Sequence, residues 1–270
     1  WILPAILFIE PRGAKNIAES RMAMARIVDG KCRFPWEANM LGFDAISGPT
    51  KKAEHQSGDV MLGLEMAAAQ GLVANDQVDR IGKAVANHYL SRITKNEGGQ
   101  SEIRGVTSVN EWVEGNNCLY TNAIADWTIK KYLGKDVDMV YPQNSKGDLV
   151  SHDGDRQRAY QQTAAPLVLW PLEREDLVDD PIAFLDRFEG KETPNGPAMS
   201  ASVNALIRAR YGNADDAYKS WRESWKKYIA GNPLMLFSER PGRKDLTYFS
   251  TGAAGCLNAV IYGFLGARIV

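Results

Sequence analysis

Apolar residues recur at helical spacing along most of the chain. Met199, Val203, Leu206 and Ile207 follow the spacing i, i+4, i+7 and i+8, which places them on one face of a helix. Breaks of glycine, proline, asparagine and aspartate separate further segments with this period, at about residues 14–28, 54–71, 81–89, 117–133, 156–165, 181–188, 214–225 and 252–269. The pattern therefore predicts an all-α protein with roughly ten helices.

The connections between these predicted helices differ greatly in length. Short turns such as residues 212–215 alternate with long irregular stretches at 30–50, 96–115, 135–155 and 229–250. Long loops in a compact domain usually carry function. If the short turns lie on one face and the long loops on the other, the long loops line a common site, as in a barrel of paired helices.

Composition and charge narrow the classes of partner. The 270 residues are 44% hydrophobic and 24% charged, and 32 basic against 33 acidic residues give a net charge of -1. The sequence contains no long run of like charge, so we predict neither a nucleic-acid nor a membrane partner. No apolar run reaches the 18 or so residues that would cross a bilayer.

Cysteine and histidine patterns argue against a metal site or a disulfide framework. Cys32, Cys118 and Cys256 are an odd number without a C-x-x-C pair, and they are predicted to fill the core. The three histidines do not stand in metal-binding spacings, and phosphate-loop, dinucleotide and serine-hydrolase motifs are absent. We predict no metal and no cofactor. The absence of a glycosylation sequon weakly favours the cytoplasm and leaves the compartment open.

Carboxylates next to large aromatic rings recur in the long loops. Trp36-Glu37, Glu111-Trp112 and Phe237-Ser238-Glu239 each combine an acid with a flat ring. Sugar sites use flat apolar faces for stacking and carboxylates for proton transfer. Each pair taken alone is better explained by a solvated loop acid beside a core anchor. Their repetition in three long loops favours a carbohydrate site.

Several motifs in the first 160 residues resemble glycoside hydrolase family 65. They are R-F-P-W-E at 33–37, H-Q-S-G-D at 55–59, I-R-G-V at 103–106, N-E-W at 110–112 and N-N-C-L-Y-T-N at 116–122. Their order and spacing agree with the family pattern, in which the corresponding blocks include I-R-G-V, D-E-Y and N-N-x-x-Y-T-N.

The second half of the chain continues this resemblance and narrows it to the hydrolase branch of the family. It contains Q-Q-T at 161–163, G-P-A-M at 196–199, F-S-E at 237–239, T-Y-F-S-T-G-A-A-G at 247–255 and A-V-I-Y-G at 259–263. The resemblance covers the whole chain. It implies a single helical domain over residues 1–270 that is built as an (α/α)6 barrel.

The resemblance also implies a reaction, the inverting hydrolysis of a terminal α-linked glucose. The preferred substrate would be a 1,2-linked disaccharide or a glucosyl-galactose unit. By position, Glu111 would be the general acid and Glu239 the general base, with the two carboxyl groups about 6.5–9.5 Å apart. We expect a desolvated environment lined by Trp112 to hold Glu111 protonated, and Arg240 and Arg243 to keep Glu239 ionised.

Other positions are implied to bind the substrate. Trp36, Glu37, Gln161 and Gln162 match residues that contact the glucosyl unit in the family, and we add Arg104, Trp112 and Asn117 from the same loops. The sequence departs from the family pattern at three places. Gln161 replaces a lysine, Ala164 replaces an aspartate, and Asn110 stands where the family commonly has an aspartate before the acid. These changes are expected to alter subsite strength and the pKa of the acid.

The start of the chain is the largest departure. The family's W-D-x-E segment, with the aspartate that holds the terminal glucose, would precede Trp1, and so would the first one or two barrel helices. We therefore expect that the chain is a fragment of a longer protein whose preceding residues are not included, or that a second chain supplies them, or that the barrel is incomplete and inactive, or that the chain forms a homo-oligomer. An open barrel would expose apolar faces and favour association.

Two other functions are kept open. One is an α-glucoside phosphorylase of the same family, in which phosphate replaces water and Glu239 would have no role as a base. The other is a non-catalytic subunit that binds carbohydrate or another protein. Glu239 argues against the first, and the absent aspartate motivates the second.

Overall fold

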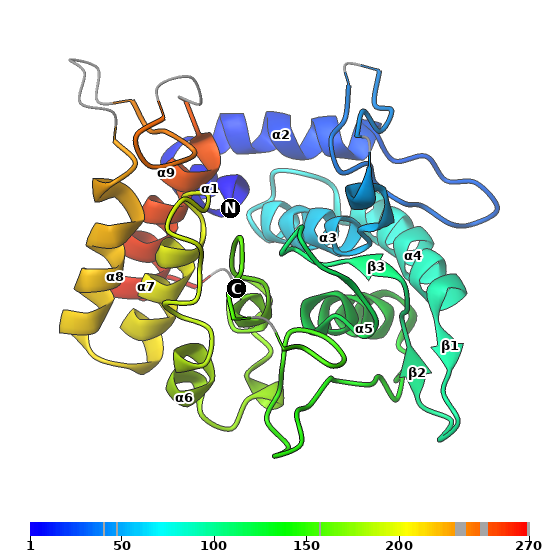
Figure 1. Cartoon of the computed structure of the whole chain (residues 1–270). Helices are drawn as coiled ribbons and strands as arrows, with labels where there is room; N and C mark the ends of the chain where they lie inside the picture. Colours follow the sequence, from blue (N-terminus) through cyan, green and yellow to red (C-terminus); the bar gives the residue numbers. More distant parts are fainter. Residues whose placement is uncertain (40, 47, 157, 230–235, 244–247, 269–270) are drawn as a thin grey trace. The chain divides into compact units, whose positions relative to one another are not determined.

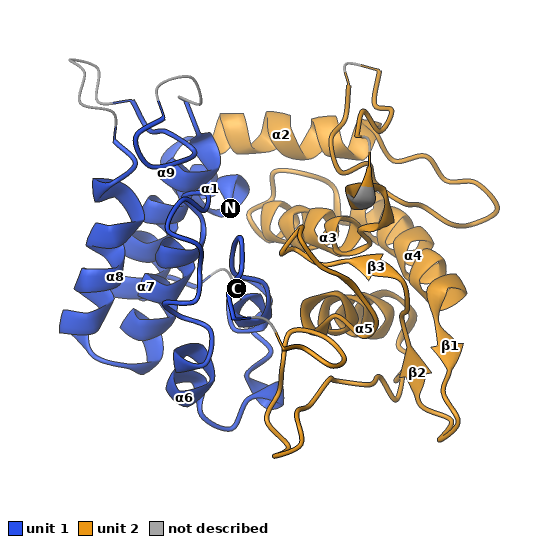
Figure 2. Cartoon of the chain, viewed as in Figure 1, with its two compact units in different colours: residues 1–10, 157–270 blue, residues 11–156 orange. Residues whose placement is uncertain are grey.

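A computed structural model describes residues 1–39, 41–46, 48–156, 158–229, 236–243 and 248–268 of the chain. This part contains nine α-helices and four two-residue strands (Figure 1). The prediction of a helix-rich protein is confirmed. Contacts divide the chain into two compact units: unit 1 comprises residues 1–10 and 157–270, and unit 2 comprises residues 11–156 (Figure 2). The single domain expected from the sequence stays a prediction.

Unit 2 has a core of three helices. It contains α2 (Pro11–Ala23), the 3-10 turn η1 (Pro49–Lys52), α3 (His55–Ala69), α4 (Asn75–Arg92) and α5 (Leu119–Leu133). Helices α3, α4 and α5 pack against one another. The apolar residues between them include Met61, Leu64, Ile81, Val85, Ile124 and Ile129.

Gly58 allows the close approach of α3 to α5. A Cβ atom at this position would lie 2.6 Å from Cγ1 of Ile124 and 3.0 Å from the hydroxyl oxygen of Tyr89. The backbone N–H of Gly58 instead donates to the Tyr89 hydroxyl at 2.9 Å. The glycine of the H-Q-S-G-D motif therefore has a packing function between three helices.

Two short hairpins occupy the long connection between α4 and α5, where the sequence predicted only irregular structure. β1 (Thr94–Lys95) pairs antiparallel with β2 (Ser101–Glu102), and β3 (Val106–Thr107) pairs antiparallel with β4 (Glu114–Gly115). In the second hairpin Val106 faces Gly115 and Thr107 faces Glu114. Two-residue strands are too short to give an alternating pattern, so the sequence carries no periodic signal for them.

Unit 1 combines both ends of the described chain. It contains α1 (Ile2–Ile9), η2 (Ala165–Val168), η3 (Glu175–Leu177), α6 (Pro181–Asp186), α7 (Ser200–Tyr211), α8 (Ala214–Lys226), α9 (Ser250–Asn258) and the π-helical segment η4 (Ala259–Phe264). Helix α7 packs against α8 and η4, and α1 packs against α9. Asn258 Nδ2 donates to the Trp1 carbonyl and Tyr262 Oη to the Pro4 carbonyl, both at 2.7 Å.

Side-chain caps explain where two helices of unit 1 begin. Asn213 Oδ1 accepts from the backbone N–H of Asp216 at 2.9 Å at the start of α8. Asp180 Oδ1 accepts from two backbone N–H groups at the start of α6, where Pro181 is the first helical residue. These are the asparagine, aspartate and proline breaks from which the sequence predicted helix boundaries.

Three predicted helices differ from the structure. Residues 158–164 are not helical, because Tyr160 instead pairs parallel to Glu192, with its N–H donating to the Lys191 carbonyl at 2.8 Å. The predicted helix at 14–28 ends at Ala23, and Val28 forms a bridge with Lys31. The last helical segment ends at Phe264 and is followed by Gly266 in the left-handed region, with φ 66°.

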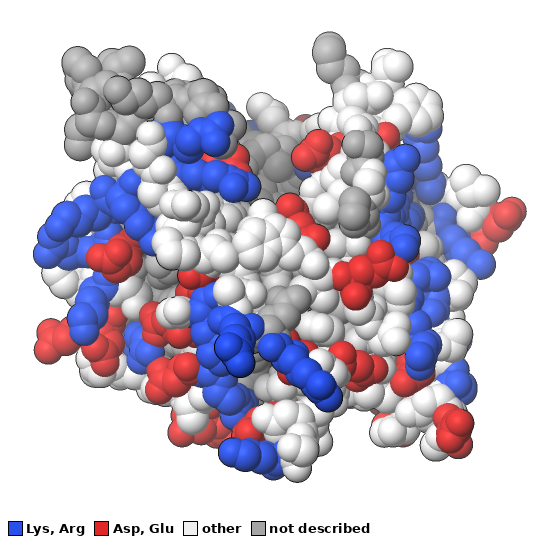
Figure 3. All heavy atoms as spheres, viewed as in Figure 1, with Lys and Arg blue, Asp and Glu red and all other residues white. Residues whose placement is uncertain are grey.

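Surface properties agree in part with the expectations from composition. Basic and acidic side chains are interspersed on the face that Figure 3 shows. Among the residues with a described placement, no helix combines the length and apolar character that crossing a membrane requires. Cys32 and Cys118 are buried as predicted, whereas Cys256 is only partly buried. Phe8 and Ile9 at the end of α1 are 63% and 58% exposed.

Candidate active site

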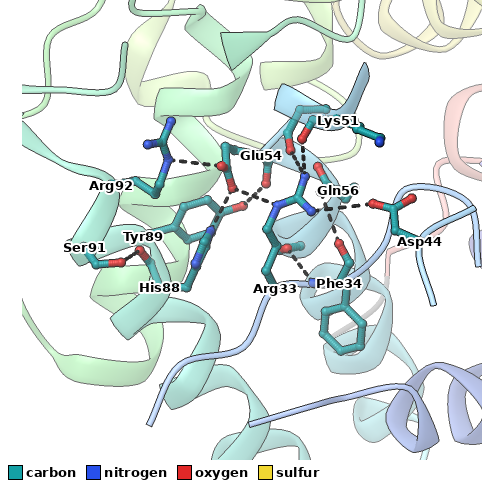
Figure 4. A network of polar contacts seen from close by, with 12 residues as sticks. Arg33, Phe34, Asp44, Lys51, Glu54, Gln56, His88, Tyr89, Ser91 and Arg92 are labelled. Carbon is teal, nitrogen blue, oxygen red and sulfur yellow. Dashed lines mark hydrogen bonds and ion pairs between the residues drawn. The ribbon is translucent and has the colours of Figure 1, made fainter. Parts of the chain in front are cut away.

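The segment that carries Trp36 and Glu37 is fixed to the start of α3 by polar contacts (Figure 4). The backbone N–H of Phe34 donates to Ser57 Oγ at 3.0 Å, and Gln56 Nε2 donates to the Phe34 carbonyl at 3.2 Å. The Phe34 side chain is completely buried. The first part of the R-F-P-W-E motif therefore anchors the segment. Trp36 and Glu37, which were predicted to bind sugar, follow it.

A buried carboxylate, Glu54, holds the arginine of this motif. It lies 2.8 Å from His88 Nε2, 3.1 Å from Arg92 Nε and 3.5 Å from Arg33 Nε (Figure 4). Arg33 Nη2 also donates to the Ala53 carbonyl at 2.8 Å. Because a buried charge is costly unless it is paired, three basic partners around one carboxylate give this cluster a single favourable geometry.

Trp36 begins a line of side chains that runs into the core of unit 2. Its ring meets the His55 ring edge to face, with centroids 5.0 Å apart, and the His55 ring lies 6.2 Å from that of Tyr120. Tyr120 Oη donates to Asp59 Oδ1 at 2.5 Å. His55 and Asp59 are four residues apart on α3, so they share one face of the helix.

Burial shifts the titration of both α3 residues. Desolvation lowers the pKa of His55 to about 3, so its imidazole is neutral at physiological pH. Desolvation also raises the pKa of Asp59 to about 6, although the Tyr120 hydrogen bond opposes this shift. Near pH 6 the His55 imidazole is therefore neutral and the Asp59 carboxyl is only partly ionised, so neither side chain carries a full charge.

Glu111 and Trp112 lie in the loop that joins β3 to β4. The loop is closed by two backbone hydrogen bonds, from Ser108 N to the Val113 carbonyl at 3.0 Å and from Val113 N to the Asn110 carbonyl at 2.9 Å. Asn110 is buried and Glu111 is partly buried. Trp112 is 59% exposed. The indole therefore lies largely in solvent, and the expected apolar enclosure of Glu111 by Trp112 stays a prediction.

Asn117 is a positioning residue within unit 2. It is completely buried, and its Nδ2 donates to Glu102 at 3.1 Å and to Asp153 at 2.8 Å. Its Oδ1 accepts from Asn122 at 3.2 Å, and its φ of 50° is a conformation that asparagine tolerates. Both hydrogens of its amide are used within the protein, and its contact with the substrate stays a prediction.

Arg104 is tied to the same network from outside. Its Nη1 donates to Glu102 Oε2 at 2.9 Å, while the arginine side chain is 56% exposed. The Arg104 and Asn117 hydrogen bonds lower the pKa of Glu102. Arg104 keeps an exposed guanidinium that can contact a ligand. Glu37, the remaining predicted binding residue of unit 2, is exposed.

In unit 1 three segments that are distant in sequence form one layer around Gln161 and Gln162. Both glutamines are buried, at 9% and 4% exposure. The backbone N–H of Thr163 donates to Ser200 Oγ at 2.7 Å, and that of Ala198 donates to the Glu239 carbonyl at 2.9 Å. The segments 161–163, 196–200 and 237–239 therefore lie side by side, as the shared motif pattern requires.

The Glu239 side chain is 30% exposed and faces a basic partner. Its Oε1 lies 3.5 Å from Arg240 Nε, a pairing that a surface loop carboxylate would make as well as a catalytic base. The neighbouring Ser238 is buried, with its Oγ donating to the Arg243 carbonyl at 2.7 Å. Arg243 thus holds the backbone next to Glu239 through its carbonyl. Glu111 belongs to unit 2 and Glu239 to unit 1.

Sequence reasoning gave no role to His55, Asp59, Tyr120, Glu54 or Glu102. The first two stand in a quoted motif, and their spacing of four residues on a helix was the available signal. The partners of Glu54 and Glu102 come from distant segments, which a single sequence does not reveal. In the described ranges, no group of three or more histidine, cysteine, aspartate or glutamate side chains is arranged to hold a metal ion.

Comparison with known proteins finds relatives whose names are those of sugar-processing enzymes. No family model matches the chain. Kojibiose hydrolase of Flavobacterium johnsoniae is 28% identical to it and aligns with 100% of the chain and 44% of its own length. Protein-glucosylgalactosylhydroxylysine glucosidase of Gallus gallus is 25% identical and aligns with 100% of the chain and 43% of its own length.

A solved structure shows the fold. A putative kojibiose phosphorylase from the human microbiome superposes with a TM-score of 0.72 at 15% identity, over 98% of this chain and 44% of that one. The chain thus spans less than half the length of the relatives that it matches. The resemblance found in the motifs is confirmed: the chain is a relative of the glycoside hydrolases named kojibiose hydrolase and protein-glucosylgalactosylhydroxylysine glucosidase.

Proposed function

We propose that this chain carries the general acid and the general base of an inverting α-glucosidase. The substrate is a terminal α-linked glucose, with a 1,2-linked disaccharide or glucosyl-galactose unit preferred over trehalose. The similarity to kojibiose hydrolase along the whole chain is the main support. The shared fold with the phosphorylase structure supports the further proposal that the helices form an (α/α)6 barrel.

In this mechanism Glu111 protonates the glycosidic oxygen as the bond breaks, and Glu239 removes a proton from the attacking water. The placement of Glu239 supports its role, because its backbone carbonyl accepts from Ala198 in segment 196–200, and Ser200 of that segment accepts from Thr163, next to the buried Gln162. Trp36 supplies a flat face for stacking, and the two glutamines supply donors and acceptors for sugar hydroxyls.

Release of glucose tests the reaction. The chain is incubated with kojibiose, glucosyl-α-1,2-galactose and trehalose, with and without phosphate, and the first anomer formed is followed by NMR. We expect β-glucose without phosphate, with kojibiose or the galactoside turned over faster than trehalose. A phosphate requirement would instead indicate a phosphorylase. Sugar-dependent stabilisation without turnover would indicate a carbohydrate-binding subunit.

Two variants separate the acid from the base. Glu111→Gln and Glu239→Gln should each lower kcat on kojibiose by roughly 10²–10⁴-fold. α-Glucosyl fluoride needs no protonation of its leaving group, so Glu111→Gln should retain hydrolysis of this substrate whereas Glu239→Gln should not. Glu114→Gln is the matched control, since Glu114 lies in the same hairpin as Glu111 and pairs with Lys52 at the surface. Equal loss on both substrates in the Glu111 variant would contradict its role as the acid.

A further inference from the structure

Unit 1 contains a second pocket that the glucosidase proposal does not use. Its volume is about 300 Å³, and it lies between α7, α8 and the segment 189–197. Its lining includes Glu189, Glu192, Ser200, Ala201, Asn204 and Glu223. This volume is at the lower end of the range for small-molecule sites, which suits a ligand the size of one sugar ring.

Asn204 gives the pocket an unused hydrogen-bond acceptor. The residue is 3% exposed, and its Nδ2 donates to Glu192 Oε1 at 3.2 Å. Its Oδ1 is buried and has no hydrogen-bond partner among the described residues. A buried polar atom without a partner is costly, and a ligand that brings a donor to this oxygen removes the cost.

Five charged side chains of both signs line the pocket, Glu189, Glu192, Glu223, Lys219 and Lys227, so the charges offset one another in part. Glu189 accepts from Arg208 Nε and from Ser220 Oγ, both at 2.7 Å. Glu192 accepts from the backbone N–H of Gly190 at 2.9 Å, and burial raises its pKa toward the uncharged form. The lysine Lys219 on the lining is exposed and interacts weakly with Asp216. A lining of this kind favours neutral hydroxyl groups over a strongly charged ligand.

We propose that this pocket binds a neutral polyhydroxylated molecule of about monosaccharide size, with Asn204 Oδ1 accepting a hydrogen bond from a ligand hydroxyl. The proposal is independent of the reaction assigned to Glu111 and Glu239. It adds a second carbohydrate-type site, which shares Ser200 and the segment 196–197 with the candidate active site but places the ligand against Asn204 between α7 and α8.

Hydrogen exchange followed by mass spectrometry tests this site on the whole chain. D-glucose and myo-inositol are the polyol probes, and ethanolamine and inorganic phosphate are the charged probes. We expect both polyols to slow exchange in peptides that cover residues 189–204 and 214–228. Protection by a charged probe alone, or no protection of these peptides by any probe, would overturn the proposal.

Two pocket variants and one control define where the polyol binds. Asn204→Leu keeps the side-chain size but removes the acceptor. It should raise the polyol concentration that gives half-maximal protection about tenfold. Ala201→Phe fills the pocket from a partly exposed position and should abolish the protection. Gln162→Ala, in the candidate active site, should leave it unchanged. Protection that survives both pocket variants, or that disappears in the Gln162 variant, would place the ligand elsewhere and refute the proposal.

Discussion

At the residue scale, burial changes what a polar side chain can do. Asn117 and Asp59 both stand in the motifs that indicated a sugar site, yet each is used within the protein. Asn117 bridges two carboxylates, and Asp59 accepts a hydrogen bond from Tyr120. A binding motif can therefore contain two kinds of polar residue. Some contact the ligand, and others hold the ligand-contacting residues in place.

The buried Asp59 predicts a pH dependence of stability. Its folded-state pKa of about 6 lies above the ordinary aspartate value of 3.8, so the folded chain binds this proton more tightly than the unfolded chain. The stabilising contribution is fully present below about pH 3.8 and is lost as the pH rises through about 6. Asp59→Asn keeps an acceptor for Tyr120 and removes the charge. It should stabilise the chain by roughly 1–3 kcal/mol near pH 8 and have little effect near pH 4.

Thermal unfolding of both proteins across this pH range measures the effect. Asp44→Asn is a suitable control, since Asp44 is a partly exposed carboxylate that faces Arg33 at 3.6 Å. That variant should not gain stability at high pH. If Asp59→Asn lost stability near pH 8, the carboxylate would be the favoured form in the folded chain and the assignment of a raised pKa would be wrong.

The motifs name candidate site residues, whose roles stay predictions, and the structure adds their contacts. Gln161, Gln162 and Glu239 were identified from motifs, and the structure brings their segments together. The exposure of Trp112 and the burial of Asn117 could not be foreseen. Both depend on how the β3–β4 loop and the start of α5 fold against residues that are distant in the chain, and a local motif does not encode that.

At the element scale, the glycine of H-Q-S-G-D sets how closely α3 and α5 approach. Gly58→Ala would place a methyl group 2.6 Å from Ile124 Cγ1. Overpacking of this kind typically costs about 1–3 kcal/mol, which exceeds the roughly 1 kcal/mol that alanine gains in helix propensity. We expect a lower Tm, measured by circular dichroism.

A glycine with open space around it provides the control. At Gly98 an added Cβ would make only an ordinary contact, 3.4 Å from Asn96 Oδ1. Gly98→Ala should therefore leave the Tm nearly unchanged. A Gly58→Ala protein as stable as the original chain would show that the helices separate at little cost, and that the glycine is not required for packing.

Element prediction succeeded where periodicity and caps agreed and failed where tertiary pairing decided. Helices α4, α7 and α8 lie where apolar spacing placed them, and Asn213 marks the start of α8. Residues 158–164 contain alternating polar and small residues that a helix could accommodate. Pairing of Tyr160 with residues 191–193 satisfies their backbone instead, and such a partner cannot be read from local sequence.

At the scale of the whole molecule, each unit has contacts that unite distant parts of the chain. Tyr262 Oη donates to the Pro4 carbonyl across 258 residues of sequence, within unit 1. Tyr132 Oη donates to Glu65 Oε1 at 2.6 Å within unit 2. The two tyrosines therefore form a matched pair for asking whether local stability is confined to one unit.

Removal of either hydroxyl should loosen only its own unit. Tyr262→Phe keeps the ring next to Trp170 but removes the hydrogen bond. The loss of about 1 kcal/mol of local stability corresponds to roughly fivefold faster hydrogen exchange in residues 2–9 and 250–264. Tyr132→Phe should affect α3 and α5 instead. Equal acceleration in both units for either variant would show that they open together.

The docking of α1 onto α9 has a consequence for biosynthesis. Unit 2 is continuous in sequence, so it can begin to fold while the rest is still being translated. The apolar helix α1 must wait for the residues around Asn258, which are added roughly 10–50 s later at typical elongation rates of about 5–20 residues per second. During that interval Leu3 and Leu7 have no native partner, and the nascent chain is at that stage a substrate for chaperones.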